Sequence, residues 1–168
     1  AIAAPTAGLH FTEDLFRRLR KTAINIATVT LHVGPGTFKP VTTEQIEDHQ
    51  MGGEVFHIGE ETAKAIIQTK RAGGRVVAVG TTVVRTLETV AQAKGEIIPM
   101  SGESRLFVTP GFQFKIVDAL MTNFHLPRTT LLMLVSSIAG IEPIRRAYAE
   151  AVSERYRFYS YGDAMLIL

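Results

Sequence analysis

A short apolar segment between two helical patterns constrains the fold of this chain more than any other feature. Residues 75–79 form a compact, β-branched run, which predicts a strand buried on both faces. The helical spacing of apolar residues over 60–71 stops before it at Gly73-Gly74, and Gly80-Thr81-Thr82 opens a second helix after it. A helix, a buried strand and a helix in this order predict an α/β fold, a layered mixed sheet flanked by helices.

The remaining patterns add strands and helices around this unit. Thr12 is followed by acidic and then basic residues, which predicts a capped helix. Further strands are expected over residues 24–33, 54–58, 105–108, 114–121 and 164–168, and further helices over 43–49, 129–139 and from Pro143. In the last helix the spacing turns five residues inward: Ile144, Ala147, Tyr148, Ala151 and Val152. All of these elements fit one α/β domain over residues 1–168.

The composition excludes several classes of protein and of site. With 46% hydrophobic and 20% charged residues, the chain has the balance of a soluble globular domain. It has no cysteine, so disulfides, thiol nucleophiles and cysteine-zinc sites are excluded. Its longest apolar run is far shorter than the roughly 20 residues that span a bilayer, and no secretory signal opens it, so a cytoplasmic protein is expected. The net charge of +2 permits a nucleic-acid partner without arguing for one.

The stretch Thr122-Asn123-Phe124-His125-Leu126-Pro127 places polar groups where two apolar segments meet. Burying Asn123 and His125 there is costly unless both are hydrogen-bonded. A strand that ends in Asn-x-His and stops at a proline is typical of one that delivers side chains to a site. The alternative, a satisfied core histidine beside a turn, fits these six residues equally well.

The turn Gly80-Thr81-Thr82 is a candidate anion site. Free N–H groups and the positive end of a helix attract a carboxylate or a phosphate. Arg85 follows one turn later and offers a charge-assisted, bidentate contact to the same anion. Alternatively, a threonine merely caps the helix and Arg85 pairs with Glu88 at i,i+3. The local pattern does not decide between these interpretations.

Five histidines are spread along the chain: His10, His32, His49, His57 and His125. None forms H-E-x-x-H or another metal pair, so no metal site is expected. His10 and His32 stand at the ends of expected elements, as His125 does, where sites are often built.

Two glycines, Gly34 and Gly36, follow His32. They either let a ligand approach the backbone closely or only make a tight turn. The sequence has no G-x-G-x-x-G after a strand and no G-x-x-x-x-G-K-[ST]. The dinucleotide-binding and P-loop classes therefore lack their fingerprints.

Residues 155–163 alternate arginines and aromatic residues before a single carboxylate, that of Asp163. Aromatic rings stack on bases while arginines contact phosphates, and aromatic faces also hold cations such as a sulfonium. For three of the four aromatic residues, covering the core is the favoured interpretation. Asp163 precedes an apolar strand, so its carboxylate needs a partner, and its pKa is open to tuning for catalysis.

Several sequence blocks, in order and over nearly the whole chain, resemble the C-terminal part of the S-adenosylmethionine:tRNA ribosyltransferase-isomerase (QueA) family. The blocks are residues 3–12, Leu31-His32-Val33-Gly34 with Gly36-Thr37-Phe38, and residues 79–88, 122–127, 130–135 and 156–167. The resemblance implies the family's α/β domain without its inserted β-barrel domain. Because the chain also begins with Ala1 rather than Met and opens in mid-motif, we expect a fragment of a longer two-domain enzyme.

The resemblance implies an unusual use of S-adenosylmethionine, as a ribosyl donor and co-substrate with no resident cofactor and no metal. The acceptor is 7-aminomethyl-7-deazaguanine at the wobble position of certain tRNAs. The product is epoxyqueuosine, and adenine and methionine are released. Because the sulfonium acidifies the ribose C5′ protons, the reaction needs a base whose pKa lies near the operating pH.

The resemblance also implies roles for individual residues. His125 is the leading candidate for the base, Asn123 orients substrate, and Asp163 or His10 handles the acceptor amine or the adenine. The other candidates bind substrate: Thr81, Thr82 and Arg85 hold the methionine carboxylate or a tRNA phosphate, and His32, Gly34 and Gly36 line the ribose.

Two positions depart from the family pattern and keep another class of function open. Gly52 stands where a histidine is usual, and Arg105 stands where a carboxylate is usual. A non-catalytic tRNA-binding module or a decayed paralogue is therefore the alternative. A third possibility, an anion-binding α/β enzyme unrelated to RNA, rests only on residues 80–85.

Overall fold

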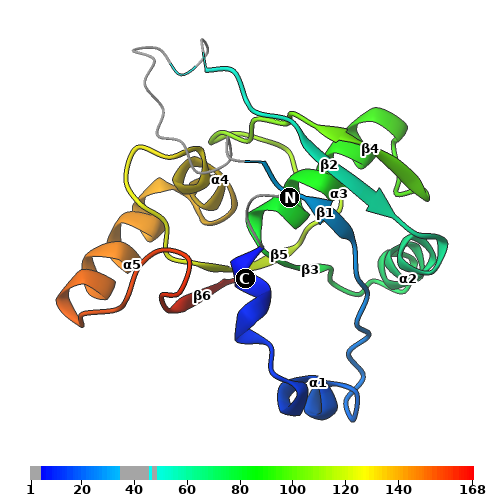
Figure 1. Cartoon of the computed structure of the whole chain (residues 1–168), viewed down its shortest axis with the longest axis horizontal. Coiled ribbons are helices and arrows are strands. Elements are labelled where there is room, and N and C mark those ends of the chain that lie inside the picture. Colours follow the sequence, from blue (N-terminus) through cyan, green and yellow to red (C-terminus); the bar gives the residue numbers. More distant parts are fainter. Residues whose placement is uncertain (1–4, 35–45, 47–48) are drawn as a thin grey trace.

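A computed structural model describes residues 5–34, 46 and 49–168 of the chain, and these residues form an α/β fold (Figure 1). The described elements are η1 (Thr6–His10), α1 (Glu13–Leu19), β1 (Thr30–His32), β2 (Glu54–Ile58), α2 (Glu60–Arg71), β3 (Val77–Val79), α3 (Thr81–Lys94), β4 (Met100–Ser104), β5 (Ala119–Asn123), α4 (Thr130–Ala139), α5 (Ile141–Ser153) and β6 (Ala164–Ile167). The α/β class predicted from the helix–strand–helix unit is therefore confirmed.

The strands of the described residues divide between two small sheets. In the first sheet β2 lies between β1 and β4 and is antiparallel to both, with Phe56 opposite Leu31 on one side and Gly102 on the other. In the second sheet β5 lies between β3, which is parallel to it, and β6, which is antiparallel. The second sheet is thus the mixed one, and the parallel pair brings the carboxyl ends of β3 and β5 to the same edge.

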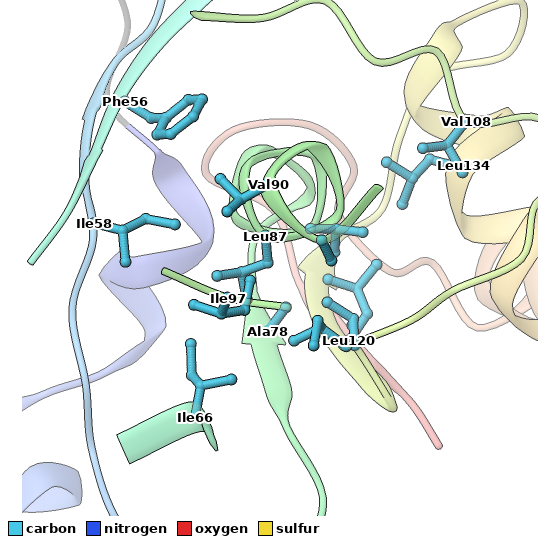
Figure 2. Packing of buried hydrophobic residues seen from close by; sticks show 14 of the residues in the cluster. Phe56, Ile58, Ile66, Ala78, Leu87, Val90, Ile97, Val108, Leu120 and Leu134 are labelled. Carbon is cyan, nitrogen blue, oxygen red and sulfur yellow. The ribbon is translucent and has the colours of Figure 1, made fainter. Parts of the chain in front are cut away.

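Helix α3 joins the two sheets, because it contacts β4 of the first sheet and β3 and β5 of the second (Figure 1). Four apolar residues of α3 are buried in the core: Val84, Leu87, Val90 and Ala91. Figure 2 shows Phe56 and Ile58 of one sheet approaching α3 from one side and Ala78 and Leu120 of the other sheet from a different side. Full burial of such a side chain contributes about 1.5–3 kcal/mol, so this core fixes α3 firmly between the sheets.

Local signals at the helix ends agree with the structure. The Thr12 Oγ1 atom accepts a hydrogen bond from the Leu15 N–H group at 3.2 Å and caps α1. The Thr129 Oγ1 atom accepts one from the Leu132 N–H group at 3.3 Å and caps α4. The predicted ranges of β2 and α2 are confirmed, and α4 and β6 each differ from prediction by one residue at one end.

The strand expected over 105–108 is wrong and the one expected over 114–121 is confirmed only at residues 119–121, because buried side chains of α3 take backbone groups of the other residues. The Glu88 carboxylate accepts the N–H groups of Lys115, Ile116 and Val117, each at 2.9 Å. The Leu106 carbonyl accepts from the Arg85 Nε atom at 2.9 Å. With these donors and acceptors occupied by side chains, the ladders form over β4 and β5 instead.

Several other predicted elements are present but are shorter or less buried than expected. The strand expected over 24–33 contains only the three residues of β1. Strand β3 is not buried on both faces, since Val77 is 48% exposed and β3 pairs only with β5 in the described part of the chain. In α5, Ala147 and Val152 face outward, because the helix packs along a narrow face that buries Ile144 and Ala151. Most of the helix expected over 43–49 falls outside the described residues.

No helix of the described residues combines the length and the apolar character needed to cross a membrane.

Candidate active site

A pocket, here the inner pocket, opens where the carboxyl ends of β3 and β5 meet the N-termini of α3 and α4. This is the edge of a parallel strand pair, where α/β proteins commonly bind ligands. The residues that line the pocket come from five separate segments: Pro5, Thr6, Ala7, Gly80, Thr81, Thr82, Thr122, Asn123, His125, Leu126, Thr129, Leu131, Tyr159 and Ser160. Four of the predicted site residues, Thr81, Thr82, Asn123 and His125, therefore share one cavity.

Gly80 makes the sharp turn that points the first turn of α3 at the inner pocket. Its φ of 96° lies in the region that favours glycine, and its N–H group donates to the Met121 carbonyl at 2.8 Å. Gly80 is the N-cap of α3 and no side chain caps the helix, so the alternative in which a threonine caps it is wrong. Among the described residues, the buried Thr81 and Thr82 hydroxyls have no hydrogen-bond partner.

Asn123, at the end of β5, connects the inner pocket to the N-terminal segment. Its Nδ2 atom donates to the Nε2 atom of His10 at 3.0 Å, across 113 positions of sequence. The structure thus brings His10 and Asn123 together, as the site prediction requires. In this hydrogen bond the His10 Nε2 atom is the acceptor, so the ring carries its proton on Nδ1.

His125 is buried, with 8% of its surface exposed. Its Nε2 atom lies 3.2 Å from the Thr122 hydroxyl oxygen, and its backbone N–H group donates to the Tyr148 hydroxyl at 2.9 Å. Burial lowers the pKa of His125 to about 4. The imidazole is therefore neutral at neutral pH, which differs from the near-neutral pKa expected of a base at this position.

A second cavity, here the outer pocket, adjoins the inner one. Its lining residues are Thr6, Leu9, His10, Arg157, Ser160, Tyr161 and Gly162. Thr6 and Ser160 line both pockets, so the two adjoin each other and are described together as one depression. His10 lines the outer pocket and is bonded to Asn123 of the inner one, which gives the depression a histidine at its junction.

Asp163 closes the loop that forms a wall of both pockets. Its carboxylate accepts the Arg157 backbone N–H group at 2.7 Å and the Arg157 Nη2 atom at 2.6 Å, and its own N–H group donates to the Arg157 carbonyl at 2.7 Å. The hydrogen bonds from Arg157 lower the pKa of Asp163, which keeps the carboxylate ionised. Asp163 itself lines neither pocket, so its geometry favours a role in holding residues 157–163 in place.

Arg85 is directed away from both pockets. Its guanidinium is buried, with the Nη1 atom 2.9 Å from the Glu54 carboxylate and the Nη2 atom 3.3 Å from the Gly52 carbonyl. Burial lowers the pKa of Arg85, and the Glu54 charge opposes that shift. Neither interpretation of Arg85 holds: it reaches no ligand pocket, and its partner is Glu54 rather than Glu88.

The remaining predicted residues do not reach the described pockets. His32 is exposed at the end of β1, and Gly34 lines neither cavity. Gly36 lies outside the described residues. Of the two departures from the family pattern, Arg105 is on the surface with its Nε atom 2.8 Å from Glu103, and Gly52 contributes its carbonyl to Arg85.

Sequence reasoning missed Tyr159, Ser160, Thr6 and Thr129 as lining residues. The aromatic run was the available signal, but three of its four rings were expected to cover the core. The structure assigns two to that role: Tyr156 and Phe158 pack with Phe124 at ring-centroid distances of 5.6 and 5.3 Å. Tyr159 and Tyr161 are instead 44% and 84% exposed.

Within the described residues, no three histidine, aspartate or glutamate side chains gather into a group that could hold a metal ion. The expectation that the chemistry needs no metal remains a prediction.

Comparison with known proteins identifies relatives along almost the whole chain. A family described as "Queuosine biosynthesis protein" matches residues 1–167. The S-adenosylmethionine:tRNA ribosyltransferase-isomerase of Pelobacter propionicus is 56% identical over 99% of this chain and 49% of its own length. The protein of the same name from Acidiphilium cryptum is 57% identical over 99% of this chain and 48% of its own. The chain thus spans about half the length of these curated relatives.

One solved structure has the same fold. The S-adenosylmethionine tRNA ribosyltransferase from Thermotoga maritima matches with a TM-score of 0.78 and 47% sequence identity. The match covers 96% of this chain and 51% of the Thermotoga chain.

Proposed function

Because the chain belongs to the queuosine biosynthesis protein family, we propose that its joined pockets form part of the active site of an S-adenosylmethionine:tRNA ribosyltransferase-isomerase. The reaction would transfer the ribosyl group of S-adenosylmethionine to 7-aminomethyl-7-deazaguanine at the wobble position of a tRNA, and isomerise it to give epoxyqueuosine. Adenine and methionine would leave. The observation that carries the proposal is the pair of adjoining pockets, the inner one at the ends of β3 and β5, with unpaired hydroxyls, an amide and two histidines.

The methionine carboxylate is assigned to the first turn of α3. The N–H groups of Thr81 and Thr82 have no partners within the helix, whereas that of Val83 already donates to the Gly80 carbonyl at 3.1 Å. The positive helix end favours an anion there. The hydroxyls of Thr81 and Thr82 line the same wall and are free to donate. This assignment replaces the contact expected from Arg85, whose guanidinium is bonded to Glu54.

His125 remains the proposed acceptor of a ribose C5′ proton, with a restriction. If its Nε2–H group donates to the Thr122 hydroxyl, the Nδ1 atom is left with a lone pair. A base whose pKa is about 4 is weak, so the step depends on the sulfonium to acidify the carbon. The proton moves from C5′ to Nδ1, and the electron pair stays on carbon beside the sulfur.

The outer pocket is assigned to the acceptor nucleotide. His10 stands at the junction of the pockets, where its Nε2 atom can take the proton that the attacking amine must lose once the Asn123 amide releases that atom. Tyr161 is 84% exposed at the rim and offers a face for stacking on an unpaired base. We therefore place the tRNA on the side of Tyr161 and the nucleoside in the inner pocket, and we expect the protein to act in the cytoplasm with tRNA.

Adenine release tests this function. The intact protein is incubated with S-adenosylmethionine and tRNA that carries the aminomethyl precursor, and free adenine is measured. His125→Ala is expected to lower turnover by 10²–10⁴-fold, the usual contribution of a general base. Arg146→Ala, an exposed change on α5, serves as the control and should leave turnover unaltered. Absence of adenine from the wild-type reaction would contradict the proposal.

The alternative, a tRNA-binding module without catalysis, receives no support from the pockets. It was motivated by Gly52 and Arg105, and neither residue lines the inner or the outer pocket. The same assay separates the two functions, because a binding module would bind tRNA with a steep salt dependence and release no adenine.

A further inference from the structure

We propose that Tyr159 meets the sulfonium charge and thereby makes the inner pocket select S-adenosylmethionine over neutral thioethers. This inference rests on the proposed function, since it specifies which part of the co-substrate lies against which residue. It concerns a residue that the sequence did not mark as part of the site. Three observations carry it: the charges around the pocket, the backbone at Tyr159, and the contacts that hold the turn.

The first observation is that the inner pocket offers no carboxylate to a bound cation. Its described lining consists of hydroxyl, amide, imidazole and apolar groups together with Tyr159. The nearby buried carboxylates are occupied elsewhere, that of Glu54 by Arg85 and that of Glu88 by three backbone N–H groups. The carboxylate of Asp163 is held by Arg157. A positive sulfur therefore needs another source of negative potential.

The helix ends make this need stronger. The N-termini of α3 and α4 both adjoin the inner pocket, and both carry partial positive charge. They suit the methionine carboxylate and disfavour a sulfonium. A phenol ring presents a negative face, and such faces bind ammonium-type cations within about 6 Å. Tyr159 supplies the one phenol among the described lining residues, on a different segment from either helix end.

The second observation is the backbone of Tyr159. Its φ is 74°, in the left-handed region that a residue with a bulky side chain rarely adopts. Glycine would adopt this conformation without strain. The same turn uses a glycine at Gly162, yet position 159 is a tyrosine. A strained non-glycine residue that lines a cavity is a common mark of a functional position.

The third observation is that surrounding contacts hold this turn. The Tyr159 N–H group donates to the Phe124 carbonyl at 2.9 Å, and the Tyr159 carbonyl accepts from Gly162 at 3.0 Å. A Cβ atom at Gly162 would lie 2.3 Å from the Arg157 carbonyl oxygen, so the turn closes only with glycine there. Together with the Asp163–Arg157 pair, these bonds fix Tyr159 at the pocket wall.

The test compares two ligands that differ by one charge. Binding of S-adenosylmethionine and of S-adenosylhomocysteine, its neutral thioether analogue, is measured by calorimetry on the intact wild-type protein and on Tyr159→Phe and Tyr159→Leu. The wild type should prefer the sulfonium ligand. Tyr159→Phe keeps the ring and should keep that preference, whereas Tyr159→Leu should reduce it by about tenfold.

Tyr161→Leu is the matched control, because Tyr161 belongs to the same loop but lines only the outer pocket. It should leave the ratio of the two affinities unchanged. The inference is overturned if Tyr159→Leu weakens both ligands equally, if Tyr159→Phe behaves like Tyr159→Leu, or if the wild type shows no preference. In those outcomes adenine release by the wild type still supports the proposed function. If the wild type binds neither ligand, the proposed function is overturned as well.

Discussion

Helix α3 contains two kinds of buried polar residue, one turn apart, and they differ in their partners. Arg85 and Glu88 face the core side, where Arg85 is paired with Glu54 and Glu88 accepts three backbone N–H groups. Thr81 and Thr82 face the inner pocket, and their hydroxyls have no partner among the described residues. Buried polar groups in proteins are normally satisfied. The paired residues therefore hold the fold. The buried Thr86 hydroxyl also has no partner among the described residues but lines neither pocket, so it is the combination of an unpaired hydroxyl and a place in the pocket wall that indicates a ligand contact at Thr81 and Thr82.

The largest effect that this comparison predicts is on stability, at the paired residues. Arg85→Met leaves the Glu54 carboxylate buried without its cation and should lower the free energy of unfolding by about 3–5 kcal/mol. Denaturant unfolding measures it, with the exposed Arg146→Met as control. Adding Glu54→Met should recover part of the loss, because the stranded charge is then gone. A loss below about 1 kcal/mol in the single variant would mean that the pair is not a structural element.

The next effect is a pH dependence of stability from His125. Its pKa is about 4 in the folded protein and near 6.5 when unfolded, so the unfolded chain binds the proton more readily. The stability that comes from burying His125 in its neutral form is fully present above pH 6.5. The free energy of unfolding then decreases as the pH falls toward 4, by up to about 3 kcal/mol. Unfolding of the wild type and of His125→Asn across this range isolates the contribution. Parallel pH profiles for the two proteins would show that His125 is not buried in neutral form.

A smaller effect is expected at two buried threonines of similar exposure, which should respond differently to replacement by valine. Thr62 donates its hydroxyl proton to the Thr28 carbonyl at 2.7 Å, whereas the Thr82 hydroxyl has no partner among the described residues. Thr62→Val should cost about 1 kcal/mol of stability and leave ligand binding intact. Thr82→Val should cost almost no stability and weaken S-adenosylmethionine binding by about tenfold, or 1.4 kcal/mol. If Thr82→Val binds normally, the hydroxyl does not contact the ligand.

The smallest effect, on substrate binding, is expected at Asp163, which can be compared with Asp118. Both carboxylates accept a backbone N–H group at 2.7 Å and pair with a cation, and their side chains are 30% and 29% exposed. Only Asp163 closes a loop that lines the pockets. Asp163→Asn should raise KM for S-adenosylmethionine on the order of fivefold by loosening that loop, with little change in kcat. Asp118→Asn should not, and equal effects of the two variants would remove Asp163 from the site.

The fold could be predicted from the sequence wherever local pattern decides the structure. Residues 54–58 include Val55, Phe56 and Ile58, which favour a strand, and the apolar residues of 60–71 repeat in the helical period, so both elements are found as expected. The strand expected over 105–108 and the first part of the one expected over 114–121 failed for a non-local reason. Arg85 and Glu88 come from a helix more than 15 positions earlier and take backbone groups that a local pattern assigns to a ladder.

The candidate site was predicted only in part, because local pattern places some of its residues and contacts between distant parts of the sequence place the others. Asn123, His125, Thr81 and Thr82 lie at element ends that the parallel pairing of β3 and β5 brings together, and His10 reaches them through Asn123. Arg85 was misplaced because its partner, Glu54, lies 31 positions away on another sheet. Tyr159 was missed because its place at the wall of the inner pocket depends on the turn that Asp163 and Gly162 close.

The most direct test of the proposed site is a crystal structure of the intact protein with S-adenosylmethionine bound. We predict that the methionine carboxylate lies at the N–H groups of Thr81 and Thr82, with the sulfur over the Tyr159 ring and the ribose near His125. Density for the nucleoside at a surface remote from the ends of β3 and β5, with the inner pocket filled only by water, would contradict the proposal.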